Sequence, residues 1–274
     1  MQEFFDPTNP NILIFDHLDS TSLEAKRMIK SGLAEAGQII WAKTQDKAHG
    51  RHGRVWESLE GNLAFSFIIE NEKAAHEVAI YPFIAALAIQ EALADFNPEL
   101  ALSFKWPNDI FLNGKKLAGI LFESEISGGK ITKMICGIGL NNQAAPQNLA
   151  NSISLHEIGV TDIDNGALLL NIMAHFAKYL EVSAEEAACT EIYEKWLNKA
   201  HNLGKEIIVI SAGEEIRGEF CGIKQGNLVV RTAQQERLIY TGDVFFAEEQ
   251  NIITVAENVT LNNVTFLNAK QVHK

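Results

Sequence analysis

The sequence lacks the cysteine content and spacing of a disulfide-rich or zinc-binding protein. Its three cysteines, Cys136, Cys189 and Cys221, lie far apart, and no two of them form a CxxC pair. An odd number of widely spaced cysteines predicts neither a disulfide framework nor a zinc site, and it favours a reducing compartment, the cytoplasm. The histidines show no HExxH or similar spacing either, so no protein metal site is expected.

Positive charge is also scarce. The 274 residues contain 23 Lys and Arg against 35 Asp and Glu, which gives a net charge of −12. So acidic a chain is a poor general nucleic-acid binder, because neutralising phosphates requires clustered basic side chains. We therefore expect no nucleic-acid partner, and any anionic ligand must meet a local group of cations.

Long hydrophobic runs are absent. The most apolar stretch, 78–93, is interrupted by Tyr81, Pro82, Gln90 and Glu91, and it is too short to span a bilayer. The first residues do not place a basic region before an apolar one, so no signal peptide is expected. These features predict a protein without a membrane partner.

Strand-like and helix-like segments alternate along most of the chain. Strands are expected at 11–18, 38–44, 62–70, 102–106 and 130–142, with a hairpin over 110–126 that turns at Asn113-Gly114. Helices are expected at about 19–32, 77–95, 165–182 and 184–200. The first helix should begin with a capping box, because Glu24 follows Thr21 by three residues.

The pattern changes after Gly204. Short β-type runs separated by glycine or polar turns predict a small barrel, and its five basic and six acidic residues do not indicate nucleic-acid binding. We therefore predict an α+β domain over 1–203 and a small β-barrel over 204–247. The tail, 248–274, contains two β-like runs that the pattern does not place in either domain.

One loop concentrates the cations that an acidic chain needs for an anionic ligand. QDKAHGRHGRVW (45–56) contains two glycines, two arginines, two histidines and a lysine. Glycine lets the backbone approach a ligand closely, and arginine forms paired hydrogen bonds with phosphate or carboxylate oxygens. The alternative is a solvated surface loop. The sequence contains no GxxxxGK[ST] loop, so a P-loop is excluded.

A second motif places a lysine in a buried strand. KWPND (105–109) is followed by KLAG (116–119), and strict alternation puts Lys116 on the same face as Ala118 and Ile120. A lysine in a strand that is apolar on both faces is costly unless an anion meets its ammonium. The alternative is that Lys116 reaches solvent at the start of the strand. Gly119 indicates a bulge or a close ligand.

A third motif, DSTS (19–22), precedes the first helix. It fits a helix N-cap. The hydroxyls and amides at a helix N-terminus can also hydrogen-bond a polar ligand group.

Together these motifs resemble the biotin–protein ligases, also called biotin–[acetyl-CoA-carboxylase] ligases. That family carries a DSTN-like segment, a Q-x-x-GRGR-x-GR-x-W loop, and KWPND followed by KLAG, in the same order and at similar spacing. CGIGLNN (136–142) resembles a later family strand, with Asn141 at the matching asparagine, and 218–230 resembles the C-terminal SH3-like barrel. The departures are Ser22 in place of asparagine and Ala48-His49 in place of the first Gly-Arg.

The resemblance covers about residues 11–246 and implies a fold and a function. The fold is α+β, a mixed sheet flanked by helices as in class II aminoacyl-tRNA synthetases, with a C-terminal SH3-like barrel. The function is ATP-dependent activation of biotin to biotinyl-5′-AMP, with Mg²⁺ accompanying ATP, and transfer to a lysine of a biotin carboxyl carrier protein. Since the first strand begins near residue 11, the resemblance is to the form that lacks an N-terminal DNA-binding domain. Family members of this form are often homodimers.

The resemblance also implies the site residues. The catalytic cations are Lys116 and Arg51. The biotin-binding residues are Ser20, Thr21, Ser22, Gln45, His49, Gly50, Arg51, Lys116 and Gly119, and the ATP- or adenylate-binding residues are Arg51, Arg54, Trp56, Lys116 and Asn141. Two alternatives stay open: a lipoate–protein ligase, which shares the fold, and a non-catalytic biotin-binding sensor, which the changes at Ala48 and His49 would fit.

Overall fold

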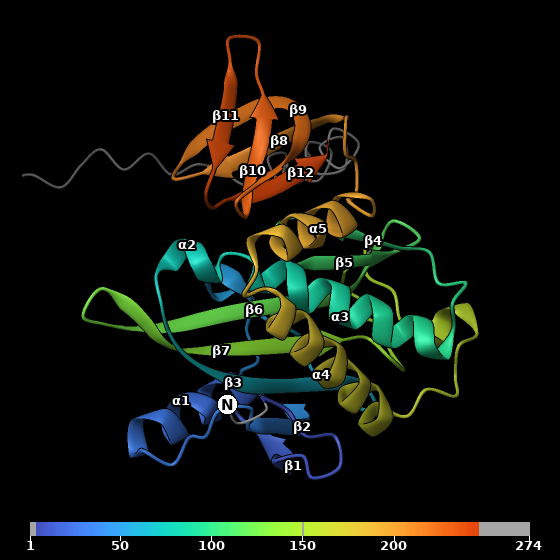
Figure 1. Ribbon diagram of the computed structural model, residues 1–274. Coiled ribbons are helices and arrows are strands. Elements are labelled where there is room, and N and C mark those ends of the chain that lie inside the picture. The colour runs from blue at the N-terminus through green and yellow to red at the C-terminus, as the bar shows by residue number, and fades with distance from the viewer. Residues whose placement is uncertain (1–3, 150, 247–274) are drawn as a thin grey trace, which may run out of the picture.

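The protein consists of a larger α+β unit and a smaller all-β unit that sits against one end of it (Figure 1). The computed structural model describes residues 4–149 and 151–246. The larger unit is built on a mixed sheet with the strand order β1-β2-β3-β7-β6-β5-β4, in which β1 and β2 are parallel and the other pairs are antiparallel. Its strands are β1 (Ile12–Leu18), β2 (Ile39–Gln45), β3 (Leu63–Lys73), β4 (Leu102–Lys105), β5 (Asp109–Leu112), β6 (Lys115–Ser127) and β7 (Lys130–Leu140).

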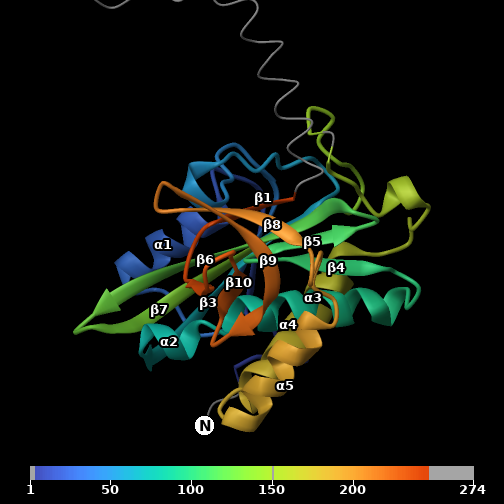
Figure 2. The ribbon, with the colours of Figure 1, turned by 90° about the horizontal axis from the view of Figure 1, so that it is seen from above.

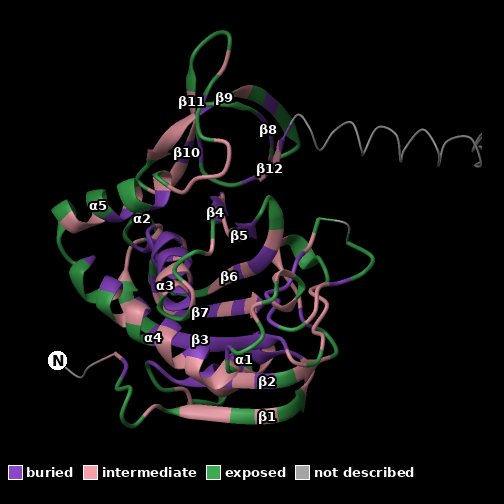
Figure 3. Cartoon of the chain, turned by 90° about the vertical axis from the view of Figure 1, so that its right-hand side faces the viewer, coloured by how far each residue is buried: buried purple, intermediate pink, exposed green. Residues whose placement is uncertain are grey.

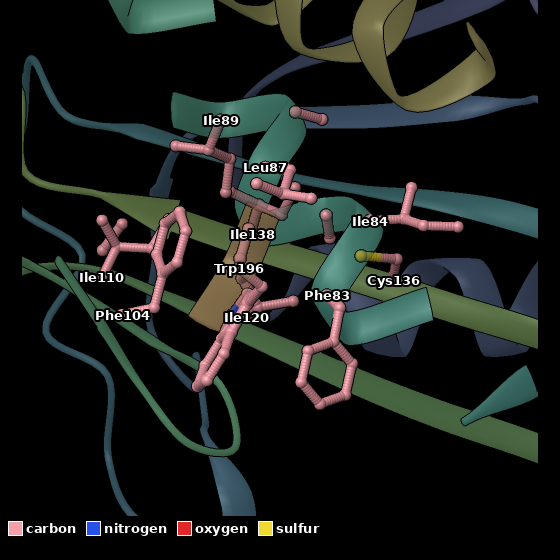
Figure 4. Close-up of a cluster of buried hydrophobic side chains, with 14 of the residues drawn as sticks. Phe83, Ile84, Leu87, Ile89, Phe104, Ile110, Ile120, Cys136, Ile138 and Trp196 are labelled. Atoms are coloured by element: carbon pink, nitrogen blue, oxygen red, sulfur yellow. The ribbon is translucent and has the colours of Figure 1, made fainter. Parts of the chain in front are cut away.

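The two faces of this sheet are covered differently. Helices α3 (Tyr81–Phe96), α4 (Asn165–Val182) and α5 (Glu186–Leu197) lie on one side, and α1 (Thr21–Ser31) lies on the other (Figure 2). Alternation along β7 sends Cys136 and Ile138 into the α3 side, where they pack with Ile84 and Leu87 (Figure 4). Because α1 covers only part of its face, the remainder of that face is available for a binding site.

The start of α1 corrects one expectation. Its N-cap is Ser20, whose side chain accepts a hydrogen bond from the Leu23 amide at 3.5 Å, and not Thr21. Glu24 does not close a capping box. Its carboxylate instead accepts from Arg27 at 2.7 Å, one helical turn later. The helix ends as expected at Gly32, which adopts a left-handed conformation with φ of 73°.

The apolar segment 75–96 forms the central core helix. One helix was expected over 77–95, but the segment divides into α2 (Ala75–Val78) and α3, because Pro82 favours the first turn of a new helix, where no amide hydrogen is needed. The helical segment is longer than the 78–93 stretch considered in the sequence, and by length and composition alone it could cross a membrane, yet 67 % of its most apolar 18-residue window is buried inside the fold. Figure 3 shows α3 and β3 among the most buried elements. The segment is therefore explained by core packing.

The hairpin at Asn113-Gly114 is confirmed. Both residues have positive φ, 52° and 76°, as a two-residue turn between β5 and β6 requires. The last expected helix is shorter than predicted, since α5 ends at Leu197 and a turn follows.

The smaller unit is a five-stranded antiparallel sheet with the order β11-β10-β9-β8-β12. It comprises β8 (Glu206–Ser211), β9 (Glu214–Lys224), β10 (Asn227–Arg231), β11 (Glu236–Ile239) and β12 (Asp243–Phe246). Its 225–226 turn docks on the larger unit, where the Trp106 indole donates to the Gly226 carbonyl at 3.3 Å. The tail, 248–274, lies outside the described residues.

Candidate active site

A cavity of about 410 Å³ lies on the α1 side of the sheet, below the cationic loop 45–56 and beside the C-terminal unit. All the residues that the sequence singled out as a candidate site line this one cavity. They are Ser20, Thr21, Ser22, Gln45, His49, Gly50, Arg51, Arg54, Trp56, Lys116, Gly119 and Asn141. Four separate segments of the chain therefore converge on a single site.

Buried hydroxyl groups form one end of the cavity. The Thr21 and Ser22 hydroxyls lie 2.7 and 3.1 Å from the Ser66 hydroxyl of β3. The Thr21 amide donates to the side-chain oxygen of Gln45, at the end of β2, at 2.8 Å. Residues 20–22 are between 2 and 5 % exposed. This end can therefore hydrogen-bond a polar, uncharged ligand group in a largely dry setting.

Asp19 fixes the entrance of α1 beside these hydroxyls. Its carboxylate accepts the Ser20 amide at 2.7 Å and two bonds from the Arg27 guanidinium at 2.8 and 3.0 Å. The hydrogen bonds from Arg27, helped by the Ser20 amide, lower the pKa of Asp19 to about 2. The aspartate of the DSTS motif thus positions the helix start and does not itself line the cavity.

Glycines open the floor of the cavity on two neighbouring strands. A Cβ atom at Gly139 of β7 would lie 2.4 Å from the Trp56 indole, and one at Gly119 of β6 would lie 3.2 Å from it. A Cβ at Gly137 would lie 2.9 Å from the Ser22 hydroxyl. Trp56 therefore lies directly against bare backbone, and at Gly119 the group in close approach is this side chain.

Lys116 faces the cavity because of a bulge. The β5–β6 register shifts so that Ile110 pairs with Ala118 while Phe111 pairs with Lys116, which leaves Leu117 as the extra residue. Leu117 is fully buried in the helix-side core. The prediction that Lys116 shares a face with Ala118 and Ile120 was wrong, because strict alternation fails across a bulge.

The Lys116 ammonium does not simply reach into solvent. Its Nζ lies 2.7 Å from an Asp109 carboxylate oxygen and 5.6 Å from the centre of the Trp56 ring. A Cβ at Gly119 would lie 3.5 Å from the same Nζ. The lysine is thus held over the glycine floor, where an anionic ligand group could approach it.

The cationic loop forms the roof of the cavity. The Gly50 amide donates to the Arg54 carbonyl at 2.8 Å, and His49 bridges to Val55, so the 49–55 segment folds back on itself. Gly53 and His52 both have positive φ, 71° and 57°, within a short 3₁₀ turn. This tight turn directs the arginine side chains toward the C-terminal unit.

Both loop arginines contact the start of β12. Arg51 donates to the Gly242 carbonyl at 3.0 Å and to the Thr241 hydroxyl at 3.4 Å, and its guanidinium lies 3.5 Å from the Asp243 carboxylate. Arg54 donates to the other oxygen of the same carboxylate. Burial lowers the pKa of Arg51, and the charge of Asp243 opposes that shift. The C-terminal unit therefore contributes directly to this site.

His49, which replaces the family arginine, faces an acidic side chain. Its Nε2 lies 3.6 Å from Glu123 of β6, whose carboxylate also lies 2.6 Å from Lys26 of α1. Two carboxylates therefore flank the loop: Glu123 lies near His49, and Asp243 lies near the two arginines.

Asn141 lines the cavity but also supports its wall. Its backbone amide donates to the Leu117 carbonyl at 2.9 Å, and its side-chain amide donates to the Ile153 carbonyl at 3.2 Å. Its side-chain oxygen accepts from Asn62 at 3.4 Å. These bonds hold the end of β7 against the 151–153 segment.

Several lining residues were not predicted from the sequence. Asp109 stands inside the quoted KWPND motif, so its spacing to Lys116 was a usable signal. Gly137 and Gly139 stand in the quoted CGIGLNN segment. Asp243, which also lines the cavity, had no local signal, and neither had Ser66, which does not line the cavity but contacts the Thr21 hydroxyl. Each reaches the site only through the fold.

The arrangement suits an elongated ligand with a polar head and an anionic group. The Ser22 hydroxyl lies by Gly137, the Lys116 ammonium lies by Gly119 and Trp56, and the two loop arginines contact residues 241–243. Among the described residues, no group of three His, Cys, Asp or Glu side chains is arranged to hold a metal ion.

Similarity to known proteins identifies the family. Residues 14–141 match the Biotin/lipoate A/B protein ligase family, and residues 203–247 match the Biotin protein ligase C terminal domain. The chain is 32 % identical over 236 residues to a biotin–[acetyl-CoA-carboxylase] ligase of Paracoccus denitrificans, covering 83 % of this chain and 97 % of that one. The chain belongs to the biotin protein ligase family.

Two further relatives agree with this assignment. A bifunctional ligase/repressor of Bacillus subtilis is 27 % identical over 242 residues, which is 85 % of this chain and 73 % of the relative. The solved biotin protein ligase of Aquifex aeolicus in complex with biotin and ATP has a TM-score of 0.72 and 29 % identity, covering 86 % of this chain and 98 % of that one.

Proposed function

We propose that this protein activates biotin with ATP to biotinyl-5′-AMP and transfers the biotinyl group to a lysine of a biotin carboxyl carrier protein. The observation that carries this proposal is the single cavity in which buried hydroxyls, a glycine floor and three cations meet. The Paracoccus relative is named for this activity, and the Aquifex structure contains both biotin and ATP.

The reaction has two steps. A biotin carboxylate oxygen attacks the α-phosphorus of ATP, and the bond to pyrophosphate breaks. The neutral amine of the acceptor lysine then attacks the acyl carbon, AMP leaves, and the amine loses a proton. The substrates supply every nucleophile, so the protein contributes positioning and charge stabilisation.

The hydroxyl end of the cavity is assigned to the biotin head. Ser20, Thr21 and Gln45 donate or accept hydrogen bonds with its polar ring, Ser22 lies beside them, and Gly119 gives the ligand room over β6. His49 and Gly50 lie above this part of the cavity as the loop begins its turn.

The cationic end is assigned to the carboxyl and phosphate groups. Lys116 and Arg51 stabilise the negative charge that develops between the biotin carboxylate and the α-phosphate. Arg54, Trp56 and Asn141 are assigned to the nucleotide, with Trp56 as an apolar wall.

Magnesium should accompany ATP, because it neutralises charge on the phosphates. Asp109 fits such an ion, since its carboxylate lines the cavity and offers the oxygen ligands that Mg²⁺ prefers. We expect few protein ligands, with the nucleotide phosphates supplying most of the coordination.

The finer description of the fold is also a proposal. We infer that the larger sheet has the plan of class II aminoacyl-tRNA synthetases and that the five-stranded unit is an SH3-like barrel. We propose a domain boundary near Gly204, with a catalytic domain at 1–203 and a barrel at 204–247; this position lies between α5 and β8.

Partners and location follow from the proposed activity. The acceptor is the carrier domain of acetyl-CoA carboxylase or another biotin-dependent carboxylase. We expect a cytoplasmic protein that can form a homodimer and that binds neither nucleic acid nor membranes.

Biotin-dependent exchange of labelled pyrophosphate into ATP tests the proposal. Activity with biotin, and much less with lipoate offered in parallel, would support it; the match to a C-terminal domain named for biotin ligases favours this result. Exchange with lipoate alone would indicate a lipoate ligase. Biotin binding without any exchange would indicate a non-catalytic sensor.

A further inference from the structure

We propose that Asp243 of the C-terminal unit is a positioning residue for the active-site loop. It holds Arg51 and Arg54 together over the cavity, and it thereby slows escape of the adenylate intermediate. The effect on the adenylate rests on the proposed function, whereas the hold on the loop does not. The C-terminal unit would in this way control retention of an intermediate whose reacting atoms it need not touch.

The contacts concentrate on three consecutive residues, 241–243. The two terminal nitrogens of Arg51 bond the Gly242 carbonyl and the Thr241 hydroxyl, which fixes the plane of the guanidinium. The Asp243 carboxylate is divided between the arginines, with one oxygen near Arg51 and the other bonded to Arg54. One carboxylate therefore links both loop cations to the C-terminal unit.

The charges explain why this carboxylate matters. The Arg51 side chain keeps 19 % of its surface exposed, and Arg54 lies close enough to disfavour the charge of Arg51 further. Arg51 is thus mostly removed from water, whereas Arg54 is 61 % exposed, and an anion placed between the two offsets their repulsion. Asp243 is that anion, so its loss should separate the arginines and open the loop.

The support for Asp243 is rigid. It is the first residue of β12, and it pairs with Ile210 of β8 in an antiparallel ladder. The preceding Gly242 packs so closely that a Cβ there would lie 2.8 Å from the Ile210 carbonyl oxygen. A loop that contains two positive-φ residues is thus tied to a fixed sheet edge.

Adenylate formation should depend on Asp243 less than adenylate retention does. Lys116 lies on β6 and pairs with Asp109, so its position does not rely on Asp243. The loop, by contrast, roofs the cavity, and Asp243 and Val244 form part of the adjoining wall. A weakened link between roof and wall should therefore raise the escape rate of the intermediate while Lys116 continues to support its formation.

The test compares three variants of the full chain. Asp243→Asn removes the charge with little change in shape, and Asp243→Glu restores it. Glu214→Gln is the matched control, because Glu214 pairs with Arg237 at 2.5 and 2.9 Å in the same unit but does not line the cavity. Pyrophosphate exchange, the escape rate of preformed biotinyl-AMP, and trypsin cleavage after Arg51 and Arg54 are measured for each.

We expect Asp243→Asn to release the adenylate about tenfold faster, the effect of losing one charge-assisted hydrogen bond, while exchange changes only a few-fold. Trypsin should cut its ligand-free loop faster than that of the parent. Asp243→Glu should recover much of both properties, and Glu214→Gln should match the parent.

Parent-like retention and cleavage in Asp243→Asn, or equal effects in Glu214→Gln, would overturn the proposal. If the parent shows no biotin-dependent exchange, the proposed function fails, yet trypsin cleavage still decides whether Asp243 holds the loop.

Discussion

At the scale of single residues, the three cations assigned to the reaction are each matched by a nearby carboxylate. Lys116 pairs with Asp109, and Arg51 and Arg54 share Asp243. Pairing keeps partly buried cations charged at a tolerable desolvation cost. An entering polyanion must therefore share these cations with the carboxylates or displace them.

Replacing Lys116 should impair chemistry without unfolding the protein. In Lys116→Ala, biotin-dependent pyrophosphate exchange should fall about a hundredfold or more, because removing one charge-stabilising group from a dry site has effects of that size. Lys115→Ala is the control, since Lys115 is exposed and does not line the cavity. Normal exchange in the Lys116 variant would remove it from the mechanism.

Replacing Arg51 should affect the intermediate more than its formation. In Arg51→Gly, the contacts to Thr241, Gly242 and Asp243 are lost, so biotinyl-AMP should escape and label lysines of added albumin. His52→Gly adds the same flexibility to the loop but keeps both guanidinium groups, and it serves as the control. If albumin is labelled no more than with the parent while exchange continues, Arg51 does not retain the intermediate.

Asp19 should make stability depend on acid pH. The Arg27 bonds lower its folded-state pKa to about 2 from 3.8, so its contribution is present above the unfolded value and is lost as pH falls through about 2. The site is partly exposed, so the contribution should be about 1 kcal/mol or less.

The measurement for Asp19 is urea unfolding of the parent and of Asp19→Asn at several pH values. The parent should be the more stable near neutral pH, and the difference should shrink between about pH 4 and pH 2. A difference that stays constant over that window would show that the Asp19–Arg27 pair does not stabilise the fold.

At the scale of elements, the site depends on two strands that present glycine on one face and apolar side chains on the other. In β7, Gly137 and Gly139 face the cavity, while Cys136 and Ile138 face the α3 side. This division lets a single strand complete the core and leave room for Trp56.

Filling the glycine floor should displace the indole. In Gly139→Ala the new methyl group would overlap Trp56, so unfolding free energy should fall by about 1–3 kcal/mol, as for other overpacked sites. Exchange activity should fall with it. In a Trp56→Ala background, the same substitution should cost much less. Additive effects of the two substitutions would mean that Trp56 does not lie on β7 in solution.

At the scale of the whole molecule, the site lies between two units. The C-terminal unit contacts the loop through 241–243 and the KWPND segment through Gly226 and Trp106. The loop and the KWPND segment thus both touch a unit that begins about a hundred residues after KWPND.

The proposed acceptor should be recognised as a folded domain. Family acceptors present their lysine on a β-hairpin, and the cavity mouth lies beside the C-terminal unit, so the partner surface should include both units. A folded carrier domain should be biotinylated much faster than a short peptide with the same lysine, as measured by transfer from preformed biotinyl-AMP. Equal rates for the two acceptors would show that surface recognition is unimportant.

The sequence by itself indicated the family, most of the order of the elements, and twelve of the residues that line the cavity. It could do so because glycine-rich turns, N-caps and hydrophobic periodicity are local signals, and because the motifs carry chemically distinctive side chains. The N-cap was misplaced by one residue, since neighbouring hydroxyls offer similar capping groups and only the backbone path selects between them.

The tertiary structure decided how the cations of the site are oriented and paired. Lys116 faces the cavity only because pairing with β5 introduces a bulge at Leu117, and a single-strand pattern cannot show a partner's register. Asp243 contacts Arg54 in the site although the two residues are 189 positions apart in the sequence. Its acidic side chain has no motif of its own, because its role arises from the packing of one unit against the other.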